Sequence, residues 1–234
     1  MERETMEYDV VVVGGGPSGL STVIKFAQMN KENGTDYSIC LLEKGSEIGA
    51  HILSGNVFQT TALDELIPNW KDLSAPLNVP VKKDKLLFLL EKISLPVPAF
   101  IMPNMNNHGN YVISLGNLCR WLAEQAESLG VEIFPGFPAS KLLYEGDKVV
   151  GVQTGDMGID ASGELKPGNE PGIEIRAKYT ILGEGCRGHL GKEIIEKFDL
   201  SKDKDPQHYG IGFKEVWKLQ EDKHEEGLVI HTNG

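Results

Sequence analysis

The most constraining stretch of the sequence is an apolar run near the N-terminus that leads directly into a cluster of glycines. Residues Val10 to Val13 are four consecutive β-branched valines. A strand that is apolar on both faces is typical of the middle of a parallel sheet with helices on both sides. We therefore predict that this run is a buried central strand, around which the rest of the chain folds.

The residues that follow the run match a dinucleotide-binding fingerprint. Gly14, Gly16 and Gly19 have the spacing G-x-G-x-x-G, which permits a tight turn, close approach of the backbone to a pyrophosphate, and close packing of a helix on a strand. From Leu20 to Met29 the apolar residues recur at helical spacing, and Asn33-Gly34 is a helix stop signal. The positive end of this helix would face the phosphates.

A second apolar run completes the unit and ends at an acidic residue. Ile39 to Leu42 is predicted as the next strand, and Glu43 follows it. A carboxylate at this position accepts hydrogen bonds from ribose hydroxyls and repels a ribose 2′-phosphate. Because strand, glycines, helix, strand and acidic residue occur in the required order, we predict a site for FAD or NAD rather than for NADP.

Charge and cysteine content argue against several other classes of function. The formal net charge of −11 disfavours nucleic acid as a partner, because neutralising phosphates requires a cationic face. Cys40, Cys119 and Cys186 are far apart in the sequence, so we predict no metal site and expect three buried, reduced side chains. We also expect no membrane-spanning helix, signal peptide or transit peptide.

The rest of the sequence predicts further parts of an α/β core. The expected elements are a short helix within Thr60 to Trp70, an amphipathic helix over Gly116 to Gly130, a strand at Val131 to Phe134, a hairpin of Ser140 to Tyr144 and Lys148 to Gln153, and a two-strand meander of Ile173 to Lys178 and Tyr179 to Leu182. The meander ends at a second glycine turn, Gly183 to Gly188, which we expect beside the first one. Tyr209 to Phe213 contains another G-x-G, but it lacks the third glycine and a following helix, so we assign it no ligand.

Prolines divide the region from Pro76 to Pro103 into short segments, which favours a second lobe made of strands and loops. Its apolar segments, Leu86 to Leu90 and Val97 to Met102, are expected to form buried core. In the alternative interpretation they line a hydrophobic substrate channel or touch lipid.

Four longer strings resemble one family of flavoproteins. They are Ile48 to Gly55, Asn106 to Tyr111, Gly183 to Leu190 and Tyr209 to Gly212. Their order and composition are similar to those of the electron-transfer flavoprotein-ubiquinone oxidoreductases, from about Tyr8 to the end of the chain. The resemblance implies an enzyme that carries FAD, accepts electrons from reduced electron-transfer flavoprotein and passes them to ubiquinone.

The fold implied by the resemblance is α/β, with a Rossmann-like FAD-binding domain of the glutathione-reductase type and an inserted, mixed β-rich second lobe. We assign residues 1–75 and 114–200, including the meander, to the FAD-binding domain. Residues 76–113 are assigned to the inserted quinone or substrate lobe, and residues 201–234 to the start of its second segment. Family members are roughly twice this length, and the cysteines of their [4Fe-4S] cluster lie in the other half. We therefore expect a chain that is truncated at the C-terminus and lacks the cluster.

The resemblance also implies which residues contact the cofactor. The pyrophosphate would lie on Gly14, Gly16, Pro17, Ser18 and Gly19, and the ribose on Glu43 with Lys44 beside it. The remaining predicted contacts are a loop that passes close to the flavin ring and the second glycine turn: Gly49, Ala50, His51, Leu53, Ser54, Gly55, Gly183, Glu184 and Gly185. From the residues alone, the loop could equally be an ordinary surface loop. The redox chemistry belongs to the flavin, so we assign no catalytic acid, base or nucleophile.

The resemblance further implies a peripheral membrane protein. It would lie on the cytoplasmic face of a bacterial inner membrane, or on the matrix face of the mitochondrial inner membrane in a eukaryote. Two alternatives stay open. One is a FixC-like or geranylgeranyl-reductase-like flavoprotein, which would have a different partner. The other is a non-catalytic FAD-binding fragment.

Overall fold

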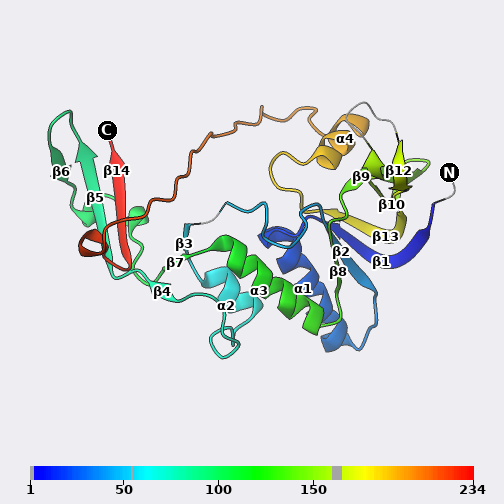
Figure 1. Cartoon of the computed structure of the whole chain (residues 1–234), viewed down its shortest axis with the longest axis horizontal. Coiled ribbons are helices and arrows are strands. Elements are labelled where there is room, and N and C mark those ends of the chain that lie inside the picture. Colours follow the sequence, from blue (N-terminus) through cyan, green and yellow to red (C-terminus); the bar gives the residue numbers. More distant parts are fainter. Residues whose placement is uncertain (1–2, 54, 160–164) are drawn as a thin grey trace. The chain divides into compact units, whose positions relative to one another are not determined.

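The computed structural model describes residues 3–53, 55–159 and 165–234, which form two compact units (Figure 1). Unit 1 consists of Met1–Ile52 and Cys119–Tyr209, and unit 2 of Leu53–Leu118 and Gly210–Gly234. Residues 53–75, next to the nucleotide-binding fingerprint in the sequence, are therefore part of unit 2.

A six-stranded sheet forms the core of unit 1, with the strand order β8-β2-β1-β13-β10-β9. These strands are β1 (Thr5–Val13), β2 (Ile39–Glu43), β8 (Glu132–Pro135), β9 (Ala139–Glu145), β10 (Lys148–Thr154) and β13 (Glu174–Leu182). Neighbours among β8, β2, β1 and β13 are parallel, whereas β9 and β10 form the predicted antiparallel hairpin. The four valines of β1 are buried in the middle of the sheet, as their sequence predicts.

Helices cover both faces of the central strand (Figure 1). Helix α1 (Pro17–Asn33) packs on β1 and β2 through buried Leu20, Val23 and Ile24, and it ends where Gly34 adopts the left-handed conformation at φ 64°. Helix α4 (His189–Lys197) lies on the opposite face of the sheet, where it contacts β9, and its Leu190 belongs to the same buried cluster as Val11 of β1. Helix α3 (Leu115–Ser128) matches the predicted amphipathic helix. Both faces of β1 are therefore buried.

One strand prediction in unit 1 is wrong. The residues from Ile173 to Leu182 do not form a two-strand meander, because β13 is one continuous strand that pairs with β1 over its whole length. No turn residue separates Lys178 from Tyr179. Strand β10 pairs with β13 only over residues 174–176, so the later residues of β13 have β1 but not β10 as a paired neighbour. The change from an alternating to an apolar sequence reflects this change in the neighbouring strands. A small hairpin of β11 (Met157–Ile159) and β12 (Leu165–Glu170) precedes this strand.

Unit 2 contains two three-stranded sheets, in the orders β14-β5-β6 and β3-β7-β4. Its elements are β3 (Asn56–Phe58), α2 (Thr61–Leu66), β4 (Val79–Pro80), β5 (Lys83–Leu89), β6 (Ser94–Pro96), β7 (Tyr111–Ile113), β14 (Leu228–Asn233) and the 3-10 turns at Ala99–Ile101, Pro103–Met105 and Glu221–Lys223. Strand β14 pairs in parallel with β5, which joins two segments far apart in the sequence. The elements are short, as the dense prolines predict.

The expectation of buried core in unit 2 is wrong for much of two apolar segments. Phe88 and Leu89 of β5 and the following Leu90 are exposed, and so are Phe100 and Ile101 in the first 3-10 turn. Prolines limit the lengths of the strands, so the described elements offer these side chains too little surface to pack against. The alternative interpretation, in which the segments line a hydrophobic substrate channel or touch lipid, therefore stays open.

The cysteines differ in environment. Cys40 and Cys119 are buried, and burial raises the pKa of their thiols to about 12 and about 11. Cys186 is exposed, contrary to our expectation, because it lies in the glycine turn after β13 rather than inside an element.

In the described part of the chain, no group of three or more His, Cys, Asp or Glu side chains is arranged to hold a metal ion. Among the described helices, none is long and apolar enough to cross a membrane.

An ion pair ties the start of β1 to the turn before β13. The Arg3 guanidinium pairs with the Asp156 carboxylate and donates to the Gly172 carbonyl oxygen at 2.8 Å. The Gly172 N–H in turn donates to Asp156 at 2.7 Å. The hydrogen bond from Arg3, followed by that from Gly172, lowers the pKa of Asp156 from its ordinary 3.8 to about 2.

This ion pair predicts a specific pH dependence of stability. Because the folded pKa of Asp156 lies below the unfolded one, its charge stabilises the fold above about pH 3.8, and the effect is lost as the pH falls towards 2. The wild-type chain should therefore be more stable than Asp156→Asn at pH 6, and the difference should vanish near pH 2. Urea unfolding at a series of pH values measures it. An equal difference at every pH would contradict the assignment.

Candidate dinucleotide-binding site

The two glycine turns meet at the carboxyl edge of the parallel strands. Gly14 follows β1, and its N–H donates to the Leu42 carbonyl oxygen of β2 at 2.8 Å. Gly183 follows β13, and its N–H donates to the Val13 carbonyl oxygen of β1 at 2.7 Å. The second turn therefore lies beside the first, as predicted. This edge is where open α/β sheets bind their ligands.

Close approach of the backbone explains why glycine is required here. Gly14 has a φ of +108°, and a Cβ atom on it would lie 2.4 Å from the Gly183 carbonyl oxygen. A Cβ atom on Gly19 would lie 1.9 Å from the Gly14 carbonyl oxygen. Gly14, Gly19 and Gly183 have no side chains. Only for this reason can strand β1, helix α1 and the turn after β13 approach one another this closely.

The N-terminus of α1 is open towards a ligand. Gly16 is the N-cap and Pro17 the first helical residue. Among the described residues no side chain caps the helix, and its first turn contains no acidic residue. A Cβ atom on Gly16 would meet nothing within 4 Å. The free N–H groups and positive dipole end of α1 are therefore available to an anion such as a pyrophosphate.

The Glu43 carboxylate has a structural role that the sequence did not reveal. One of its oxygens accepts the Gly15 N–H at 2.8 Å, and the other accepts the Gly45 N–H at 2.7 Å. The Nδ1 atom of His51 lies 4.0 Å from the same carboxylate. A carboxylate has about four acceptor positions. Glu43 can therefore hold both loops in place and still accept ribose hydroxyls.

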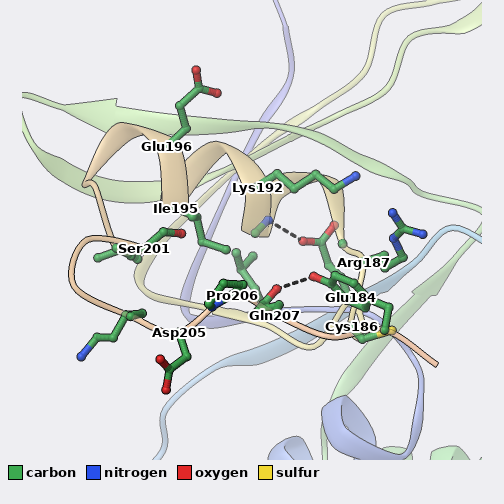
Figure 2. Close-up of a pocket in the computed structure, with 17 residues that line it drawn as sticks. Glu184, Cys186, Arg187, Lys192, Ile195, Glu196, Ser201, Asp205, Pro206 and Gln207 are labelled. Atoms are coloured by element: carbon green, nitrogen blue, oxygen red, sulfur yellow. Dashed lines mark hydrogen bonds between the residues drawn. The ribbon is translucent and has the colours of Figure 1, made fainter.

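Glu184 fixes the second turn in a similar way. Its carboxylate accepts the N–H group of Gly191 at 2.9 Å (Figure 2). It also accepts the Leu190 N–H at 3.4 Å, and so caps the first turn of α4. The Nδ1 atom of His189 lies 3.3 Å from this carboxylate. The Glu184 side chain therefore stabilises α4, a helix that our sequence analysis missed. The spacing of Leu190 and Ile194 after Gly188 was the signal for it.

A cavity of about 560 Å³ opens at this edge of unit 1. Ten of the predicted cofactor residues line it: Gly14, Gly16, Pro17, Ser18, Glu43, Lys44, His51, Gly183, Glu184 and Gly185. The prediction missed eight further residues of the wall: Val13, Leu42, Ile52, Pro138, Ala139, Arg187, Gly188 and His189. Ala139 begins β9 and Pro138 directly precedes it, and no glycine motif marks this position.

The other predicted residues lie elsewhere. Gly19 packs beneath the loop against Gly14, and neither Gly49 nor Ala50 is part of the cavity wall. Leu53 and Gly55 belong to unit 2. Ser54 is outside the described residues.

A second hollow, of about 820 Å³, lies between α4 and the segment that follows it (Figure 2). It shares Glu184, Gly185, Arg187 and Gly188 with the first cavity. The Arg187 guanidinium lies 5.0 Å from the centre of the Tyr209 ring, which is a cation–π distance. The glycine turn after β13 thus forms a wall common to both hollows.

Comparison with known proteins identifies the relatives of this chain. Residues 12–72 match the NAD(P)-binding Rossmann-like domain. The whole chain is 56% identical, over 238 aligned residues, to a protein of Pseudomonas aeruginosa named electron transfer flavoprotein-ubiquinone oxidoreductase. The chain is homologous to this family along its entire length. It is also 51% identical, over 99% of its residues, to the mitochondrial electron transfer flavoprotein-ubiquinone oxidoreductase of Dictyostelium discoideum.

The alignment covers only part of each relative. The chain spans 43% of the Pseudomonas aeruginosa electron transfer flavoprotein-ubiquinone oxidoreductase and 38% of the Dictyostelium discoideum one. It corresponds to their N-terminal portion.

Solved structures support the fold assignment. The chain superposes with a TM-score of 0.57 on a geranylgeranyl bacteriochlorophyll reductase-like protein from Thermoplasma acidophilum, at 22% identity over 80% of the chain and 42% of that protein. It superposes on CtdE in complex with FAD with a TM-score of 0.51, at 20% identity over 82% of the chain and 41% of CtdE. The fold is thus a Rossmann-like α/β fold of FAD- and NAD(P)-binding proteins. The much higher identity to the electron transfer flavoprotein-ubiquinone oxidoreductases favours them over the reductase-like alternative.

The glycine contacts predict that two alanine variants differ in their free energy of unfolding. Gly19→Ala forces a methyl group into the Gly14 carbonyl and should destabilise the fold by about 1–3 kcal/mol or more. Gly16→Ala places its methyl group in open space and should cost less than about 1 kcal/mol, the scale of a change at a helix N-cap. Urea unfolding compares them, and equal losses would contradict the packing described here.

Proposed function

We propose that this chain is the FAD-binding part of an oxidoreductase that accepts electrons from reduced electron-transfer flavoprotein and passes them to ubiquinone in the membrane. The observation that carries the proposal is the uncapped N-terminus of α1, which opens into the cavity of unit 1 in a chain 56% identical to a named electron transfer flavoprotein-ubiquinone oxidoreductase. The proposal thus combines a local anion site with homology along the entire chain.

The geometry of the cavity fits a dinucleotide. The pyrophosphate would lie on the backbone of Gly14, Gly16 and Ser18, where N–H groups and the helix dipole stabilise negative charge without any net positive charge on the protein. Lys44 and Arg187 also line the cavity, and so do the carboxylates of Glu43 and Glu184. These side-chain charges balance, so the backbone N–H groups and the dipole of α1 are what favour an anion here, in a chain whose formal net charge is −11.

The remaining contacts follow from the same placement. Glu43 would accept the ribose hydroxyls, Gly183, Glu184 and Gly185 would flank the nucleotide, and residues 49–55 would run near the flavin ring. The flavin supplies the electron-transfer chemistry when it is bound. The chain's own residues bind and orient it and exclude water, so we assign no residue of the chain to acid, base or nucleophilic catalysis.

The iron–sulfur cluster belongs to another part of the protein in this proposal. A [4Fe-4S] cluster needs four thiolate ligands, and this chain has three cysteines, of which Cys40 and Cys119 are buried with raised pKa values. The described residues therefore do not fit the cluster. We place it in the portion of the relatives that the chain does not span.

The FAD assignment predicts the behaviour of one cavity variant. Gly16→Ala puts a methyl group at the helix N-terminus where the pyrophosphate would lie, and should weaken FAD binding at least tenfold while leaving the fold intact. Quenching of flavin fluorescence on titration with the protein measures the affinity. The control is Gly34→Asn at the far end of α1, where asparagine tolerates the left-handed conformation, and it should bind FAD like the wild type. Equal affinity of Gly16→Ala and wild type would contradict the site.

We propose that the membrane and the quinone tail contact unit 2. The β14-β5-β6 sheet of this unit lines a cavity of about 350 Å³. Its wall is apolar at Leu86, Leu87 and Val97 and polar at Asp84, Lys85, Asn106 and His231. The His231 Nε2 atom lies 3.5 Å from the Asp84 carboxylate, so these two polar side chains hold each other in place. A hollow with both apolar and polar walls suits a quinone, which has an apolar tail and carbonyl oxygens.

Exposed apolar side chains next to this cavity support the membrane contact. Phe100 is 82% exposed and Ile101 57% exposed, and Met102, which lines the cavity, is also exposed. A peripheral protein gains affinity for a bilayer by burying such side chains. On this proposal the protein lies on the cytoplasmic face of a bacterial inner membrane, or on the matrix face of the mitochondrial inner membrane in a eukaryote.

Charged substitutions test the membrane contact. Replacing both Phe100 and Ile101 by Asp should lower binding to phosphatidylcholine vesicles at least tenfold, because each buried side chain contributes roughly 1.5–3 kcal/mol. Vesicle sedimentation measures the binding. Met157→Asp, which changes an exposed apolar residue of unit 1, is the control and should have no effect. Unchanged binding of the double variant would contradict the contact.

A further inference from the structure

Residues 211–219 have the sequence pattern of a strand, although the structure does not place them in a sheet. Every second position is large and apolar, apart from Glu215 in the middle: Ile211, Phe213, Trp217 and Leu219. The positions between them are smaller or cationic: Gly212, Lys214, Val216 and Lys218. A period of two is typical of a strand with one buried face.

The apolar face of this segment is uncovered. Figure 1 shows the region as an extended trace that joins no sheet. Ile211 is 87% exposed, Phe213 95% and Trp217 75%, whereas Trp70 and Trp121 are buried. A contiguous group of large exposed apolar side chains marks an interaction surface.

The opposite face is already fixed within unit 2. The Lys214 ammonium donates to the Gly55 carbonyl oxygen at 3.0 Å and to the Asn56 side-chain oxygen at 3.0 Å.

On the uncovered face, the Trp217 indole N–H donates to the Glu215 carboxylate at 2.9 Å, so the Trp217 ring can be buried without losing a hydrogen bond. One face of the segment is therefore anchored, and the other is prepared for burial.

We infer that residues 211–219 form a strand that pairs with the portion of the protein found in the longer relatives and not spanned by this chain. The alignment includes the segment, and more than half of each relative's length lies outside it. The partner is thus a β-structured polypeptide with an apolar face that covers Phe213 and Trp217. This inference does not depend on the flavin site.

A second copy of the chain is a poorer occupant. In an antiparallel self-pair that sets Phe213 opposite Trp217, Glu215 lies directly opposite its own copy. Like charges at directly opposed positions destabilise a sheet. The charge at the centre of the segment therefore favours a different sequence as its partner.

Hydrogen exchange tests the inference. The materials are the 234-residue chain and a chimera in which the remaining part of the Pseudomonas aeruginosa relative continues this chain, with that intact relative as a reference. The backbone amides of residues 211–219 should exchange at the rate of an unfolded peptide in the chain alone. Exchange should be at least 100-fold slower in the chimera and at the aligned residues of the relative. Equally fast exchange in the chain and in the relative would overturn the inference.

Two matched variants of the chimera identify the buried face. Phe213 and Val216 are each 95% exposed in the structure and point to opposite faces of the predicted strand. Phe213→Asp should abolish the protection, whereas Val216→Asp should preserve it. Equal effects of the two variants would overturn the strand assignment. Concentration-dependent protection of the chain alone, with a dimer in light scattering, would show self-pairing and would also overturn it.

Discussion

The structure of unit 1 depends on the close approach of three backbone segments at glycine. Gly14, Gly19 and Gly183 allow the end of β1, the first turn of α1 and the turn after β13 to touch without intervening side chains. This contact sets the angle at which α1 leaves the sheet and brings the two turns to the same edge. The cavity exists because these backbone segments are close together while the space in front of Gly16 stays open.

Two carboxylates then hold the turns in place. Glu43 accepts backbone N–H groups from Gly15 and Gly45, and Glu184 accepts those of the first turn of α4. Both acids thus stabilise loop conformations by charge-assisted hydrogen bonds. The N–H groups at the start of α1 have no such acceptor, and this difference leaves that helix terminus available for a ligand. An acidic chain can in this way present a local site for an anion.

Much of unit 1 could be predicted from the sequence because its signals are local. Four valines, three spaced glycines and a terminal Glu43 define a strand, a turn and a binding edge within 36 residues, from Tyr8 to Glu43. Features that depend on tertiary neighbours were harder to predict. The continuity of β13 could not be inferred because its pattern changes where β10 ends, and α4 is a short helix with few periodic positions.

The predictions for unit 2 were weaker for a related reason. Its apolar segments were expected to form buried core, and Phe88 and Phe100 are instead exposed. Apolarity shows that a side chain favours burial, but it does not identify the partner that buries it. The chain spans only about two fifths of its relatives, so composition could not show whether that partner is the unit itself, a membrane or another part of the protein.

The most direct test of the central claim is to follow the backbone amide resonances of unit 1 by NMR while FAD is added. The account predicts that the amides of Gly14, Gly16, Ser18 and Gly19, together with those of Gly183 and Gly185, shift and saturate at one FAD per chain. If FAD binds while these amides stay unchanged, or if no amide responds in the folded protein, the placement of the dinucleotide at the start of α1 is contradicted.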